Sequence, residues 1–100
     1  MLSMGGMPMP RIFNVDKWVV FFWSGEGVPL EQIHVHVSLK TPQVGATKIW
    51  LTSSGGCLLA NNDSNIPMPI LRSLMEIIET RKFEIMAKWK EHFGSITHYC

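Results

Sequence analysis

Two histidines placed two positions apart are the strongest chemical signal in the chain. His34 and His36 lie in a stretch that alternates polar and apolar residues, which is the pattern of a β-strand. Residues two apart on a strand point to the same face, with Cα atoms about 6.5–7 Å apart, so both imidazoles can converge on one ligand. Because histidine changes charge near neutral pH, such a pair can serve as general acid and general base on a scissile phosphate. One hypothesis is therefore a metal-independent ribonuclease that uses His34 and His36.

Lys48 and Trp50 would complete that catalytic site. Residues 46–52 alternate as a further strand, with Lys48 and Trp50 on one face. If this strand pairs antiparallel with the histidine strand through the turn-rich residues 40–45, the two histidines meet Lys48 and Trp50 across the ladder. Lys48 would stabilise phosphate charge, and Trp50 would stack on a base of the RNA substrate. A slip of one residue in register would send Lys48 to the opposite face, so the hypothesis depends on the pairing.

The same histidines also fit a metal-binding module. Glu26 lies in the loop that precedes them and would supply the carboxylate of a set made of Glu26, His34 and His36. Two histidines and one carboxylate suit a divalent transition metal, iron or manganese as well as zinc. Apart from this alternative, the sequence indicates no cofactor, since it has neither a phosphate-binding loop nor a dinucleotide-binding glycine pattern.

A structural interpretation of these residues stands beside the chemical ones. It places His34 and His36 on the solvent face of an amphipathic strand, hydrogen-bonded to their neighbours. Trp50 is then a core residue, and Cys57, which lies in an apolar run after two glycines, is a small buried hydrophobe. The sequence therefore leaves open whether the protein is an enzyme.

Composition and charge limit the partners. Nine Lys and Arg against eight Asp and Glu give a net charge of +1, too even for strong nonspecific attachment to nucleic acid. The unbroken run of large apolar residues covers only residues 18–23, whereas a membrane-spanning helix needs about 20. Residues 1–8 lack the basic start and apolar stretch of a secretory signal. We therefore expect a cytoplasmic protein without a membrane partner.

A chain of 100 residues predicts one domain. We expect a flexible lead-in over residues 1–8, a single domain over 9–94 and a tail over 95–100. Alternation, β-branched residues and the turn residues between them predict strands at 11–15, 18–23, 33–39, 46–52 and 57–60. The strand at 18–23 is apolar at both parities, so we expect it to be covered on both faces or to expose aromatic side chains to a partner.

After the polar residues 61–65 the pattern becomes helical. Pro67 and Pro69 suit the start of a helix, Thr80 is the predicted N-cap of a second helical segment, and Gly94 is the predicted stop. Strands followed by helices favour the α+β class. We predict a mostly antiparallel sheet of about five strands, with two C-terminal helices, or one kinked helix, packed on one face.

Several segments together resemble a small bacterial family known as domain of unknown function 4160. The segments are MPRIF at 9–13, Glu26 with Pro29, IHVHV at 33–37, GATKIWL at 45–51, LANNDSNIP at 59–67 and IMAKW at 85–89. The family is uncharacterised. Its genes are often found beside a second small gene, an arrangement similar to toxin–antitoxin pairs. The resemblance therefore implies a partner: a small protein encoded by an adjacent gene.

The leading functional hypothesis follows from these observations. Small size, nearly balanced charge, the apolar segment 18–23 and the resemblance favour an interaction protein of a toxin–antitoxin-like two-gene module. It would bind its partner through a sheet edge or an aromatic surface. The ribonuclease, with RNA as its partner, and the metal-binding module are the alternatives.

Overall fold

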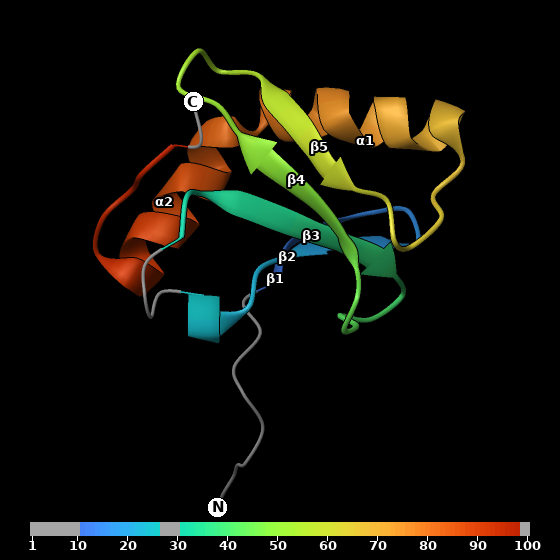
Figure 1. Cartoon of the computed structure of the whole chain (residues 1–100), viewed down its shortest axis with the longest axis horizontal. Coiled ribbons are helices and arrows are strands. Elements are labelled where there is room, and N and C mark those ends of the chain that lie inside the picture. The colour runs from blue at the N-terminus through green and yellow to red at the C-terminus, as the bar shows by residue number, and fades with distance from the viewer. Residues whose placement is uncertain (1–10, 27–30, 99–100) are drawn as a thin grey trace, which may run out of the picture.

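The computed structural model describes residues 11–26 and 31–98. Within them, five strands form one sheet in the order β1-β2-β3-β4-β5, each strand antiparallel to the next (Figure 1). The bounds are β1 (Arg11–Val15), β2 (Trp18–Phe21), β3 (His34–Leu39), β4 (Thr47–Leu51) and β5 (Cys57–Asn61). The five predicted strands are therefore confirmed, each to within two residues of its bounds. The predicted lead-in at 1–8 and the last two residues of the predicted tail lie outside the described residues.

A short 3-10 helix, η1 (Ser24–Glu26), follows β2, and two α-helices, α1 (Met68–Thr80) and α2 (Lys82–Phe93), follow the sheet. Two separate helices are thus present rather than one kinked helix, and the α+β class is confirmed. Gly94 ends α2 at a positive φ of 87° and donates its N–H to the carbonyl of Lys90, as predicted. No helix in the described residues is long and apolar enough to cross a membrane.

The prediction that Thr80 caps the second helix is wrong. Thr80 is the last residue of α1, and its hydroxyl donates to the carbonyl of Glu76 at 2.9 Å. A threonine hydroxyl inside a helix can always turn back to the preceding turn, which removes it as a cap. Arg81 forms the junction instead, and its guanidinium makes two 2.9 Å hydrogen bonds to the carboxylate of Glu84 in the first turn of α2.

The helices cover one face of the sheet. The side chains of Val20, Val35 and Ile49 point to this face and pack in one core with Leu74 of α1 and Trp89 of α2. The opposite face holds a smaller cluster. Because the four residues Val19, Val20, Phe21 and Phe22 are all fully buried, the segment after Trp18 is covered on both faces, as its composition predicts.

A polar loop fixes the path from the sheet to α1. Asn62 accepts a hydrogen bond from the Thr47 hydroxyl at 2.8 Å and from the Ile66 N–H at 3.0 Å. The Ser64 hydroxyl donates to the carbonyl of Val37 at 3.1 Å. These contacts tie residues 61–66 to β3 and β4, so the chain enters α1 from a fixed position.

Candidate functional site

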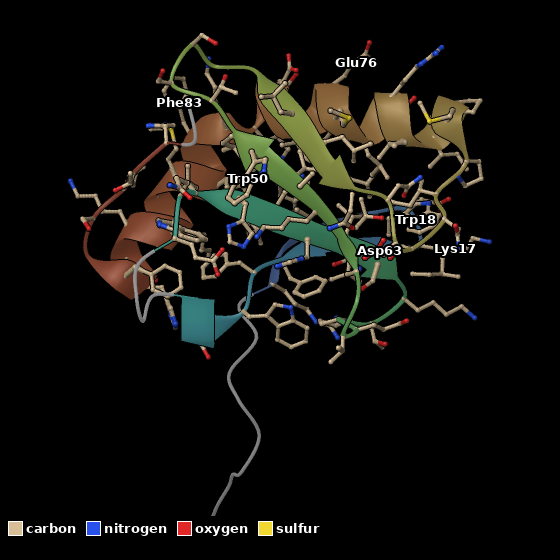
Figure 2. All side chains as sticks on the ribbon, viewed as in Figure 1. Lys17, Trp18, Trp50, Asp63, Glu76 and Phe83 are labelled. Carbon is tan, nitrogen blue, oxygen red and sulfur yellow. The ribbon has the colours of Figure 1, made fainter. Side chains whose placement is uncertain are left out.

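The register of β3 and β4 brings the predicted site residues together. His34 lies opposite Trp50, and His36 lies opposite Lys48. The imidazoles of His34 and His36 are 5.0 Å apart between ring centroids, and His34 is 5.3 Å from the Trp50 ring. Figure 2 labels Trp50 on β4, beside β3. The predicted antiparallel pairing is therefore confirmed, and the four side chains share one face.

The two imidazoles are nevertheless packed inside the protein. His34 is 0% exposed and His36 is 8% exposed. His34 meets the Trp89 ring of α2 at 5.2 Å, and His36 meets the Phe21 ring of β2 at 5.5 Å. The prediction that both histidines face solvent is wrong, because the strand beside them brings an aromatic side chain to this face instead of a polar one. Aromatic packing therefore surrounds the imidazoles.

A backbone contact fixes the orientation of His34. Its Nδ1 is 2.8 Å from the carbonyl oxygen of Gln32. Since a carbonyl can only accept, Nδ1 carries a proton and donates it in this hydrogen bond. The ring is thereby held both by packing and by its hydrogen bond, as expected of a structural histidine.

Lys48 is engaged by two neighbours. Its Nζ is 3.2 Å from Oε1 of Glu31 and 4.3 Å from the centroid of the Trp50 ring. The ion pair and the cation–π contact compensate its charge within the fold. Glu31 was not among the predicted site residues, since it precedes the strand pattern and nothing in its spacing connects it with Lys48.

The proposed metal set is only partly described. Glu26 lies in η1, but its side chain is outside the described part of the structure. Among the side chains that are described, no three His, Cys, Asp or Glu residues are grouped to hold a metal ion. The set made of Glu26, His34 and His36 therefore stays a prediction.

Cys57 is held as a protonated thiol. It is half-buried, and its Sγ is 3.4 Å from Oε2 of Glu79 and 3.7 Å from the carbonyl of Met75. Burial and the Glu79 carboxylate raise the pKa of this thiol to about 12. A thiol needs a lowered pKa to act as a nucleophile, so Cys57 has a packing role.

The edge strand β5 is a feature that the sequence did not single out. It is the last strand of the sheet and carries no charged residue and no proline between Cys57 and Asn61. Leu58 is 45% exposed and Leu59 is 39% exposed. Leu58 lies opposite Trp50, on the histidine face, whereas Leu59 lies opposite Ile49, on the helix-covered face. Edge strands of soluble proteins usually carry charges or proline or are covered by a helix or loop. β5 has neither a charge nor a proline, and α1 contacts it at Cys57.

The fold and the site thus describe a small α+β protein with a packed aromatic–histidine face and an uncharged edge strand that carries two partly exposed leucines. A family model described as "Domain of unknown function (DUF4160)" matches residues 18–90, and the chain belongs to this family. Comparison with curated proteins and with solved structures found no match.

Proposed function

We propose that the protein is an interaction module that binds a partner protein by adding an extended segment of that partner to the edge of β5. The observation that carries the proposal is the uncharged edge strand with a partly exposed leucine on each face. An extended segment laid along β5 would form main-chain hydrogen bonds with it, and its successive side chains would contact Leu58 and Leu59 in turn.

The energetics favour a partner at this place. An unpaired strand edge exposes backbone N–H and C=O groups, and it serves as a template for another strand. Covering the exposed part of each leucine would contribute about 1 kcal/mol. Leu58 lies opposite Trp50 on the neighbouring strand, so the apolar surface on that face includes more than one side chain.

The partner that we propose is the small protein encoded by the adjacent gene, in a toxin–antitoxin-like two-gene module. This choice is supported by the family resemblance, and the size of the chain and its nearly balanced charge agree with it. A strand taken from a different protein completes the sheet without requiring a second copy of this chain.

The ribonuclease alternative is weakened by burial. A general acid or base must contact the scissile phosphate, and His34 is fully buried. Lys48 is paired with Glu31, so its charge is compensated before any substrate binds. We therefore assign a packing role to the two imidazoles in this proposal.

The test is co-expression of this protein with the product of the adjacent gene, followed by size-exclusion chromatography. We expect one complex, and we expect Leu58→Lys to weaken it at least tenfold, because a charge would be buried beside the added strand. The matched control is Leu39→Lys, since Leu39 is 40% exposed and lies at the end of β3. No complex, a dimer of this chain alone, or equal losses in both variants would contradict the proposal.

A further inference from the structure

A cavity of about 210 Å³ lies beside the turn between β4 and β5. Its walls come from three parts of the chain that are far apart in sequence: the turn at residues 52–56, the start of α2, and His98. Figure 2 labels Phe83, the aromatic residue of α2 at this cavity, close to the turn. The cavity is separate from the histidine face and from the β5 edge of the proposed function.

Lys82 is the first cation at the cavity. It is half-buried and is the first residue of α2. A positive charge at a helix N-terminus is unfavourable because the helix dipole is positive there. No carboxylate in the described residues forms an ion pair with Lys82. The nearby Glu84 is paired with Arg81, and Glu31 is paired with Lys48. A half-buried ammonium at an unfavourable place, in no ion pair within the described residues, is a candidate group for binding an anion.

The turn lies against this ammonium. Gly55 has a positive φ of 95°, and a Cβ at this position would collide with Nζ of Lys82. The turn is closed by hydrogen bonds from the Gly55 N–H to the Thr52 carbonyl at 3.1 Å and from the Gly56 N–H to the Thr52 hydroxyl at 3.1 Å. The positive φ favours glycine at this position, and the missing Cβ leaves room for the end of the Lys82 side chain.

His98 is the second basic side chain at the cavity. The Ile33 N–H donates to the carbonyl of Thr97 at 2.7 Å, which anchors the chain next to the start of β3. This contact places the half-buried His98 at the cavity. The Ser54 hydroxyl, 3.0 Å from the Thr52 hydroxyl, adds a group that can donate or accept a hydrogen bond to the same wall. Glu79 does not line the cavity, and its Oε2 accepts a hydrogen bond from the Cys57 thiol.

The rest of the cavity is apolar. Leu51 and Met86 contribute to its lining, and Phe83 is 71% exposed. Its ring lies 5.2 Å from Nζ of Lys82, so the aromatic surface and the ammonium are neighbours. A ligand that fits both would have an anionic head and a flat apolar body.

We infer that this cavity binds a small organic phosphate, with the phosphate at Lys82, His98 and Ser54 and a flat apolar group against Phe83. Two groups that can carry positive charge, together with a hydroxyl donor, match a dianionic phosphate better than a single carboxylate. The inference rests on the cavity alone and does not depend on the proposed partner at β5.

The test is a titration of the full-length ¹⁵N-labelled protein with phenyl phosphate and, separately, with inorganic phosphate. We expect saturable shifts of the Gly55, Gly56 and Lys82 amide resonances, with phenyl phosphate the tighter ligand. Lys82→Gln should weaken binding at least tenfold, because a charge-assisted hydrogen bond is lost. The matched control is Lys88→Gln, an exposed lysine of the same helix that does not line the cavity.

Two further variants separate the parts of the site. His98→Gln should weaken both ligands, whereas Phe83→Ala should weaken phenyl phosphate and leave inorganic phosphate unchanged. Lys82→Gln should keep its fold, since removing a cation from a helix N-terminus is not destabilising. The inference is overturned if no saturable shift occurs at the turn, if Lys82→Gln binds like the wild type, or if Lys88→Gln loses as much affinity.

Discussion

The two edge strands of the sheet meet solvent differently. At one edge, β1 exposes Arg11 and Asn14 and buries Ile12 and Phe13. The guanidinium of Arg81 lies 3.7 Å from the centroid of the Phe13 ring and covers it. At the other edge, β5 has no charge and leaves Leu58 and Leu59 partly exposed. The two edges therefore differ in charge and in exposed apolar side chains, and β5 is the edge at which we propose that a partner binds.

The largest expected effect belongs to the β1 edge. Phe13→Ala should lower the free energy of unfolding by about 3 kcal/mol, because it empties a buried aromatic position. Leu59→Ala should lower it by less than about 1 kcal/mol, since much of that side chain is exposed. Urea denaturation of both variants measures the difference. Equal losses would mean that the two edges are packed alike.

The second prediction concerns affinity at the β5 edge. Leu58→Ala and Leu59→Ala should each weaken the complex with the adjacent gene product about fivefold, as the loss of about 1 kcal/mol implies. Isothermal titration calorimetry with the purified partner measures it. Asn14→Ala, at an exposed position of β1, is the control and should bind like the wild type. If Asn14→Ala weakens the complex and the leucine variants do not, the edges have been assigned the wrong way round.

A smaller effect is expected where Arg81 covers β1. Arg81→Gln loses the contact with the Phe13 ring and the paired hydrogen bonds to Glu84, so the unfolding free energy should fall by about 0.5–1 kcal/mol. The control is Arg72→Gln, at an exposed position of α1, which should change stability less. The denaturation midpoints of the two variants measure this difference. A larger loss of stability in Arg72→Gln would show that Arg81 does not stabilise β1 by covering the Phe13 ring.

The smallest effect is a pH dependence of stability that arises at Cys57, the first residue of β5. The pKa of the Cys57 thiol is raised to about 12 by burial and by Glu79, so the folded state keeps this proton at a pH where the unfolded chain releases it. Its contribution to stability is complete below the ordinary thiol pKa and is lost as the pH rises toward 12. Cys57→Ala should therefore show a shallower loss of stability in alkaline solution. The same slope in both proteins would contradict this.

Much of the fold could be predicted because its signals are local. Alternation at residues 33–39 and 46–52, with a turn-rich segment between them, favours antiparallel pairing, and the pairing places His34 opposite Trp50 and His36 opposite Lys48. The helix after Pro67 and the stop at Gly94 are equally local. These features depend on residues that are neighbours in the chain.

The features that were missed depend on residues far apart in sequence. Alternation assigns the histidines to the polar face, but it does not show that Phe21 of β2 and Trp89 of α2 close over them. From the sequence, Leu58 and Leu59 are expected to be buried strand residues. Only the strand order, which places β5 at the edge of the sheet, explains their exposure. The contact of Lys82 with Gly55 likewise joins α2 to a turn between two strands.

Hydrogen–deuterium exchange of the protein, alone and in complex with the adjacent gene product, tests the central claim most directly. We expect new protection of backbone amides in β5 and unchanged exchange in β1, because the added strand forms main-chain hydrogen bonds at one edge only. Protection at β1 with none at β5, or a complex that leaves both edges unchanged, would contradict the account.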